Sequence, residues 1–484
     1  MWTLLNREQY PTNAYAKAFI AKNFIHFNTP GHRSTGIETS FNTLTQQHLF
    51  KLDMIDVNVL EATVLKDVNE QMASAYKADR CFLSTQGTST AVMAMILATC
   101  TDGGKVIVPR NVHRSVISGI ILAGAEPLFL ETEFNQTFGI SNHFTSKALK
   151  KALAEHATIQ AVLLINPTYF GVCTDLKNIV SIAHHKGVPV IVDEAHGAHL
   201  RFNDNLPISA MEAGADLAAT SLHKLGGSMN QTSILLYRQG LVDVNRVQNA
   251  MNYLLSTSRP YQMIASLDST RYQLEREGKN RLQSTLTLAN HFRSKVNQLQ
   301  GLSCPTENDL LHSDASFDYD QSKVLIQIDS LPISGYELKE KLEVDYKILL
   351  ELADVRYALA IFTTGTSPSD MDKLYDALED IVSTIEPSSP PTTPVIQPPN
   401  PTMVLTPRQA SFATTKLTNL NESLGMINTE FVISYPPGIP ILIPGEEITQ
   451  QHIDYIVTQR DSGATFVGSH DPRLENITIV QKLN

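Results

Sequence analysis

The chain has 484 residues, enough for two to four folded units with substantial cores. Hydrophobic residues make up 42% of it and charged residues 18%, which is the composition of an ordinary globular protein. The net charge of −11 argues against binding nucleic acids or anionic membrane surfaces through charge, so we expect neither partner.

The cysteines and the N-terminal sequence indicate a cytoplasmic protein. None of the four cysteines forms a CxxC pair or has zinc-ligand spacing with histidines, so we interpret them as reduced, buried side chains and expect no metal site. The opening MWTLLNREQYPTNAY lacks a basic region followed by an apolar one, so we predict no signal peptide. No stretch is long and apolar enough to predict a transmembrane span.

Residues 51–300 are predicted to form a large α/β domain, after an N-terminal segment of residues 1–50. Strand-like runs such as KVIVP, AVLLINP and VPVIVDEA alternate with helix-like segments, which predicts a mainly parallel sheet covered by helices on both faces. AVMAMILATC is predicted as a helix and QGTST as the loop before it. In such sheets ligands bind beyond the carboxyl ends of the strands, where the loops QGTST, RNVHRS, NPTYFG, DEAHG and SLHKLGG are expected.

The remainder of the chain is predicted to form three further parts. Residues 301–386 contain the strand-like runs KVLIQID and YALAIFT and a helix-like run, so we expect a smaller α/β domain. Seven of the sixteen residues in 387–402 are proline, which predicts an extended linker. Residues 403–484 are then expected to form a separate C-terminal α+β domain.

The strand-end loops lack the phosphate-binding motifs of nucleotide folds, because no GxGxxG follows a strand and no GxxxxGK[ST] occurs. Their residues suit pyridoxal 5′-phosphate instead. That cofactor needs a lysine for an imine, a carboxylate against its pyridine nitrogen, donors for its phosphate and a flat group against its ring.

Each of these requirements has a candidate at a predicted strand end. Lys224 in SLHKLGG can form the imine, and Asp193 at the end of VPVIVDEA can supply the carboxylate. His113 is a flat side chain suited to stacking on the ring. Each of these residues, taken alone, could instead have a structural role such as helix capping. Their occurrence together at strand ends favours a cofactor site. The predicted phosphate-binding residues are Gly87, Thr88, Ser89, Ser221 and His223.

The chain resembles the ornithine/lysine/arginine decarboxylases of the aspartate-aminotransferase fold, fold type I of the pyridoxal-phosphate enzymes. DEAHG together with SxHK is fairly specific for this group, and the C-terminal YPPGIP…PGE segment separates it from ordinary aminotransferases. The motifs span nearly the whole chain: NTPGHRSTG (28–36), STQGTST (84–90), VPRNVHRSV (108–116), PTYFG (167–171), VDEAHGAH (192–199), SLHKLGG (221–227) and YPPGIPILIPGEEI (435–448).

The resemblance implies roles for individual residues. Lys224 carries the cofactor, Asp193 pairs with its pyridinium and His113 stacks on its ring. His196 lies close to the reacting carbon and acts with Lys224 and Asp193 in catalysis. Glu446 is a candidate for binding the distal cationic group of the substrate; the alternative is an acid in the first turn of a helix over EITQQHIDYI.

The activity that the resemblance implies is decarboxylation of a basic amino acid. L-arginine, giving agmatine and carbon dioxide in polyamine metabolism, is favoured because short family members are often arginine-directed. Lysine giving cadaverine and ornithine giving putrescine are the alternatives. A cofactor-dependent aminotransferase or lyase and a non-catalytic relative are less favoured. We expect a homodimer or a multiple of dimers, with active sites shared between subunits.

Two segments depart from the family pattern. NTPGHR, residues 28–33, stands where the family usually has His-x-Pro-Gly-His-Lys. DVNVL, residues 56–60, replaces the usual Asp followed by Thr-Glu-Leu. Both are expected near the active site, so we expect them to bear on substrate preference.

Overall fold

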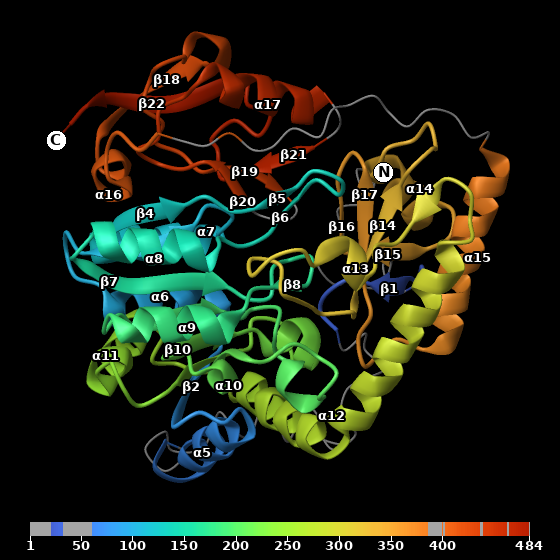
Figure 1. The fold of residues 1–484 in the computed structure, drawn as a ribbon, viewed down its shortest axis with the longest axis horizontal. Helices are drawn as coiled ribbons and strands as arrows, with labels where there is room; N and C mark the ends of the chain where they lie inside the picture. Colours follow the sequence, from blue (N-terminus) through green and yellow to red (C-terminus); the bar gives the residue numbers. More distant parts are fainter. Residues whose placement is uncertain are drawn as a thin grey trace, which may run out of the picture.

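The structure is a computed structural model that describes residues 21–31, 61–385, 399, 402–435, 439–461 and 464–483. It contains a large unit built on a seven-stranded sheet, a smaller unit built on a four-stranded sheet and a C-terminal unit (Figure 1). The predicted linker 387–402 lies almost wholly outside the described residues, as do DVNVL and most of residues 1–50. The domain boundaries therefore stay predictions.

The large unit contains the predicted, mainly parallel sheet. Every neighbouring pair is parallel except those of β11, which runs antiparallel to both of its neighbours. All residues of β9, β10 and β11 are buried, which explains why these strands are continuous apolar runs without alternation. The strand order is β2 (Arg80–Ser84), β11 (Ser233–Tyr237), β10 (Leu217–Thr220), β9 (Val190–Asp193), β7 (Ile159–Ile165), β3 (Lys105–Pro109) and β4 (Glu126–Leu130).

Helices cover both faces of this sheet. One core contains residues of α5 (Lys66–Ala75), α8 (Ser146–Glu155), α9 (Leu176–His185) and α10 (Ala210–Ala213). The opposite core contains residues of α6 (Gly87–Thr99), α7 (Arg114–Ala123) and α11 (Val244–Leu254). The prediction that QGTST is a loop was wrong, because helix α6 begins at Gly87 and its first turn includes Thr88 and Ser89.

The smaller unit follows α12 (Tyr261–Val296), the long helix that runs diagonally at the lower right of Figure 1. Its neighbouring strands pair antiparallel, and its core also includes residues of α14 (Gly335–Val344) and α15 (Pro368–Thr384). Strand β1 (Ile25–Phe27) pairs in parallel with β15 (Ile348–Leu350), which holds the N-terminal strand against this unit. The sheet order is β12 (Leu302–Ser303), β14 (Lys323–Ile328), β17 (Tyr357–Ile361) and β16 (Leu352–Ala353).

The C-terminal unit lies over the large unit at the top of Figure 1. Its sheets have the orders β20-β19-β21 and β18-β22, and together with α17 (Gln450–Asp461) they enclose a separate apolar cluster. Its other elements are α16 (Pro407–Ser411), β18 (Thr414–Asn419), η4 (Leu420–Glu422), β19 (Val432–Tyr435), β20 (Ile439–Leu442), β21 (Thr465–Val467) and β22 (Asn476–Lys482).

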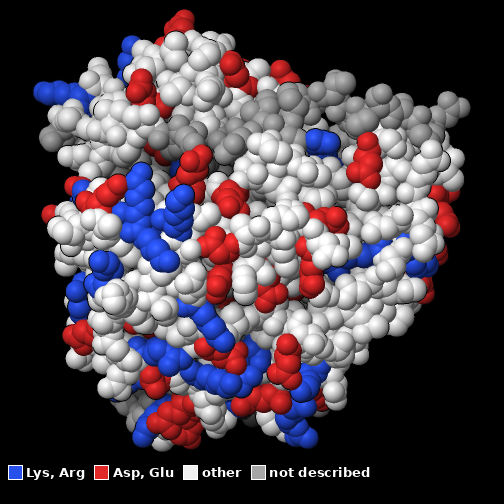
Figure 2. Space-filling view, viewed as in Figure 1, with Lys and Arg blue, Asp and Glu red and all other residues white. Residues whose placement is uncertain are grey.

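Short elements complete the first two units: η1 (Glu61–Leu65), β5 (Phe134–Asn135), β6 (Ile140–Ser141), β8 (Val172–Cys173), η2 (Leu200–Phe202), η3 (Leu222–Gly226), α13 (Glu307–Leu310) and β13 (Asp318–Tyr319). All four cysteines are buried and free. Acidic and basic side chains lie beside one another over much of the face shown in Figure 2. Among the helices that the structure describes, none combines the length and apolarity that crossing a membrane requires.

Candidate active site

A cavity of about 330 Å³ lies at the carboxyl ends of the central strands. Parallel strands bring their carboxyl ends to one edge of a sheet, so loops far apart in the sequence meet there. The C-terminal unit contributes Ile439 to the wall. Nine of the ten predicted site residues line this cavity: Gly87, Thr88, Ser89, His113, Asp193, His196, Ser221, His223 and Lys224.

Lys224 lies in the turn η3, directly after β10, and its amine is 3.0 Å from Nε2 of His196. Burial lowers the pKa of Lys224, and the charges of Asp193 and Glu351 oppose this shift. The lower pKa increases the fraction of Lys224 that is a neutral amine. The N–H of Gly31 donates to the carbonyl of Lys224 at 2.7 Å, and a Cβ at Gly31 would lie 2.6 Å from that oxygen. The described part of the NTPGHR segment therefore fixes the backbone of this lysine.

Asp193 is the last residue of β9 and is 4% exposed. Burial raises the pKa of its carboxyl group, while the Lys224 charge and the N–H of Ala195, which donates at 3.2 Å, oppose that rise. Within the described residues it forms no ion pair. A buried carboxylate in this position suits a cationic partner such as a protonated pyridine nitrogen.

Hydroxyl groups gather at the N-terminus of α6. Thr88 Oγ1 donates to Ser233 Oγ at 2.8 Å and shares a short hydrogen bond with the hydroxyl of Ser221. Gly87 has a φ of +79°, and its N–H donates to the carbonyl of Gln231 at 2.8 Å. The N-cap side chain of α6 makes no capping hydrogen bond. Helix N-termini and hydroxyl donors are a suitable combination for binding a phosphate group.

Two cavity histidines have fixed orientations. His113 is the N-cap of α7, and its Nδ1 accepts the N–H of Ser115 at 3.2 Å. His223 Nδ1 lies 2.8 Å from the carbonyl of Thr232, so it is the donating nitrogen. Burial lowers the pKa of His223 to about 4, with the Thr232 carbonyl opposing and Lys224 adding to this shift. His223 is therefore a neutral side chain near pH 7.

His196 has a second lysine partner that the sequence analysis did not find. Lys323 is the first residue of β14 and is fully buried, and its Nζ lies 2.8 Å from Nδ1 of His196. The ring of Tyr169 lies against the imidazole with 4.4 Å between centroids, and its hydroxyl donates to Oε1 of Glu351 at 2.5 Å. A lysine that opens a wholly apolar strand, KVLIQI, is the sequence signal for this contact, but it does not identify the partner.

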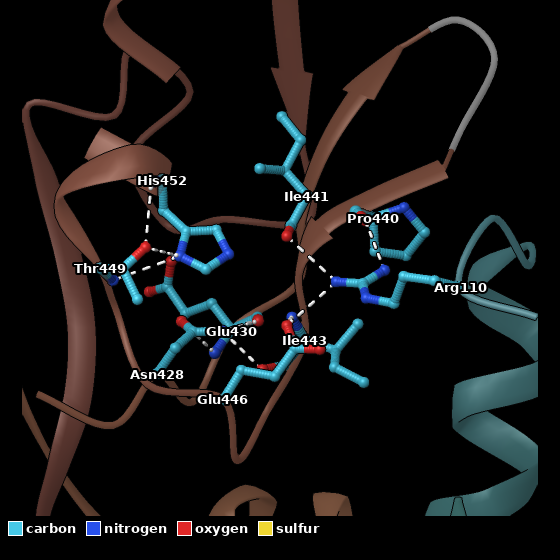
Figure 3. Close-up of polar contacts among 9 residues, drawn as sticks. All are labelled: Arg110, Asn428, Glu430, Pro440, Ile441, Ile443, Glu446, Thr449 and His452. Carbon is cyan, nitrogen blue, oxygen red and sulfur yellow. Dashed lines mark hydrogen bonds and ion pairs between the residues drawn. The ribbon is translucent and has the colours of Figure 1, made fainter. Parts of the chain in front are cut away.

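Glu446 lies in a different place from the one predicted (Figure 3). Its side chain is fully buried, and Oε2 accepts from Arg110 at 3.0 Å and from the N–H of Ile443 at 2.8 Å. Arg110 also donates to the carbonyls of Pro440 and Ile441, at 2.7 and 3.0 Å. Glu446 does not line the cavity. It is not an acid in the first turn of a helix either, because α17 begins at Gln450.

The sequence matches two models of known families. The Orn/Lys/Arg decarboxylase major domain matches residues 12–324, and the C-terminal domain of the same family matches residues 391–472. The chain belongs to the Orn/Lys/Arg decarboxylase family. A curated relative in Bacillus subtilis, named arginine decarboxylase, is 40% identical to this decarboxylase over 99% of each chain.

Solved structures show the same fold. The lysine decarboxylase of Francisella novicida superposes with a TM-score of 0.74 at 20% identity, covering 97% of this chain and 82% of that one. An alanine–glyoxylate aminotransferase from Nostoc sp. gives a TM-score of 0.57 at 15% identity, covering 74% of this chain and 95% of that one. The predicted aminotransferase-like fold type I is thereby confirmed, and the protein is an enzyme of the decarboxylase branch.

Proposed function

We propose that this decarboxylase binds pyridoxal 5′-phosphate and converts L-arginine to agmatine and carbon dioxide. The observation that carries the proposal is the position of Lys224, whose amine lies 3.0 Å from His196 in the same cavity as Asp193. The arginine preference rests on the Bacillus subtilis relative, which is 40% identical along its whole length.

The residues around the cavity fit this cofactor. Asp193 is a buried carboxyl group without an ion pair among the described residues, and it would hold a pyridine nitrogen in its protonated form. The α6 N-terminus with Thr88, Ser89 and Ser221 would bind the phosphate, and His113 would lie against the ring. When bound, the cofactor supplies an electron sink for the pair that the departing carboxylate leaves behind.

Lys224 and His196 are the groups that can move a proton at the reacting carbon. Their nitrogens are 3.0 Å apart, so a proton can pass between Nζ and Nε2. Burial lowers the pKa of both side chains, and neighbouring lysines lower that of His196 further. Both can therefore be unprotonated near neutral pH, accept a proton that the substrate's α-ammonium group loses, and deliver a proton to the α-carbon. The ring of Tyr169 lies against the imidazole, with 4.4 Å between the ring centroids.

The cavity wall contains one carboxylate among the described residues, Asp193. Because this proposal assigns Asp193 to the cofactor nitrogen, it leaves no carboxylate among the described wall residues for the guanidinium of arginine. We further propose a homodimer or a multiple of dimers whose subunits share their active sites.

Product analysis tests the proposed function. The purified protein, loaded with pyridoxal phosphate, is incubated separately with arginine, lysine and ornithine, and the amines are identified by mass. Agmatine formed fastest is the expected result. Cadaverine or putrescine as the main product would overturn the arginine preference, and no amine from any substrate would overturn the proposed reaction.

A further inference from the structure

Two lysines face the two ring nitrogens of one buried histidine. Lys224 Nζ lies 3.0 Å from Nε2 of His196, and Lys323 Nζ lies 2.8 Å from Nδ1. The three residues come from the loop after β10, the loop after β9 and the start of β14, so the large and smaller units meet here. The activity proposed above uses Lys224 and His196 and leaves Lys323 without a role.

The hydrogen bonds that His196 can make limit how many of the three side chains, Lys224, His196 and Lys323, can be protonated. A neutral imidazole has one N–H donor and one acceptor nitrogen, whereas an ammonium group donates only. If both lysines were ammonium ions, both nitrogens of His196 would have to accept, which a neutral imidazole cannot do. Burial, with the charges of both lysines, lowers the pKa of His196 well below its ordinary value, so the ring is neutral. At most one of the two lysines is then an ammonium ion.

The surrounding charges favour the proton on Lys323. Burial lowers its pKa to about 8, against the opposing charges of Asp320 and Glu351, while Lys224 lowers it further. Burial would raise the pKa of Asp320, but His199 at 3.1 Å, Lys323 and a hydroxyl group together lower it to about 2. Asp320 is therefore expected to be ionised near pH 7, and its charge raises the pKa of Lys323.

The neighbouring carboxylates stabilise a positive charge on Lys224 less than on Lys323. Asp193 and Glu351 are the carboxylates that raise its pKa against burial. Under the proposed function, on which this inference rests, Asp193 is paired with the cofactor nitrogen. When the cofactor first enters the cavity, before the imine forms, this pairing neutralises the Asp193 charge locally, and Lys224 becomes the neutral member of the group.

We propose that Lys323 is a positioning residue that holds His196 in the tautomer with its N–H on Nε2, and thereby keeps Lys224 as a neutral amine. The ammonium of Lys323 donates to Nδ1, so the ring proton is on Nε2 and points at Lys224 Nζ. Only an unprotonated amine can accept that proton. Such an amine is the form that attacks an aldehyde.

The residues packed around Lys323 hold its backbone and its side chain in position. The carbonyl of Lys323 accepts hydrogen bonds from Arg293 and from the hydroxyl of Tyr319. Gly171 has a φ of +95°, and a Cβ there would lie 2.9 Å from Cγ of Lys323. The lysine stem therefore passes through a space that a side chain at residue 171 would fill. Tyr169 faces both amines, with 5.8 Å from Lys224 and 5.9 Å from Lys323 to its ring centroid.

Capture of the cofactor by the full-length apoprotein tests the proposal without measuring turnover. One C–N bond forms at the aldehyde carbon of pyridoxal phosphate, and the aldehyde oxygen leaves as water with two hydrogens of the amine. The lysine adduct is trapped with borohydride and located by peptide mass. Its rate is measured against pH for wild type, Lys323→Met, Lys323→Arg and the exposed control Lys341→Met.

Lys323→Met is expected to move the rate profile up by about one pH unit, which makes capture at pH 7 about tenfold slower. Lys323→Arg is expected to recover much of the loss, and Lys341→Met to match wild type. A folded Lys323→Met protein with the wild-type profile would overturn the role of Lys323. Failure of wild type to form an adduct at Lys224 would instead overturn the proposed function.

A second measurement covers the case in which the variant does not fold. Imidazole ¹⁵N shifts of His196 in the wild-type chain, assigned with His196→Gln, report which nitrogen carries the proton. We expect a protonated Nε2 and an accepting Nδ1. The opposite tautomer would contradict the proposal.

Discussion

Arg110 and the two lysines at His196 are basic side chains in the interior that the protein holds in different ways. Arg110 donates to two carbonyls and to the carboxylate of Glu446, which joins the end of β3 to the C-terminal unit (Figure 3). Lys224 and Lys323 share one imidazole, and neither forms an ion pair with a carboxylate of the described residues.

The difference follows from the chemistry of the two side chains. A guanidinium stays charged in any protein environment, so its burial requires acceptors for its fixed set of donors. An ammonium group can lose its proton when burial disfavours the charge. An arginine with three acceptors is thus a structural connection, whereas Lys224 beside a neutral histidine is a reactive amine.

The largest expected effect comes from replacing Lys224. Lys224→Met removes the amine but keeps most of the side-chain volume, so decarboxylation is expected to fall by about 10³-fold or more. Stability should be unchanged or higher, because an apolar side chain replaces a buried amine. Activity and the urea midpoint are measured together, with Lys341→Met as the control. Substantial activity in Lys224→Met would contradict the assignment of the reactive lysine.

Arg110 and Glu446 should show the reverse behaviour. Arg110→Met or Glu446→Gln leaves one buried partner uncompensated, with an expected loss of about 3–5 kcal/mol in unfolding free energy. Activity per folded molecule is expected to fall far less than in Lys224→Met.

The double variant Arg110→Met/Glu446→Met completes a double-mutant cycle for this pair. It is expected to be more stable than the sum of the single effects, because it leaves no buried charge without a partner. Urea unfolding of all variants measures the coupling. Additive effects would show that the pair does not join the two units.

The fold and the position of the cavity could be predicted because they depend on local patterns. Asp193 ends an apolar strand, and Lys224 and His196 each follow one. Parallel strands place their carboxyl ends together without further information. Lys323 could not be predicted as their neighbour, because its position depends on how the smaller unit packs on the large one. Glu446 was assigned to the substrate because its motif is specific to the family. The sequence does not show that Arg110, 336 residues away, encloses it.

Glu194 extends the comparison to a buried acid and gives the smallest expected effect. It accepts the N–H of Ala210 at 2.7 Å and the hydroxyl of Thr220 at 3.3 Å, and within the described residues it has no ion pair. Burial raises its pKa from an ordinary 4.5 to about 8, with those two hydrogen bonds opposing and Glu212 adding to the shift. Like Lys224 under the proposal above, it should be neutral in the folded protein near pH 7.

This protonation makes stability depend on pH. Between about pH 4.5 and about pH 8 the unfolded chain has lost the Glu194 proton while the folded chain keeps it. The folded state therefore binds more protons, so stability is fully present below the lower value and falls as the pH rises, by at most about 1.4 kcal/mol per pH unit. Glu194→Gln removes this titration and should flatten the pH dependence of the unfolding free energy. Parallel curves for the two proteins would mean that Glu194 is ionised in the folded state, and that this buried acid, unlike Lys224, keeps its charge.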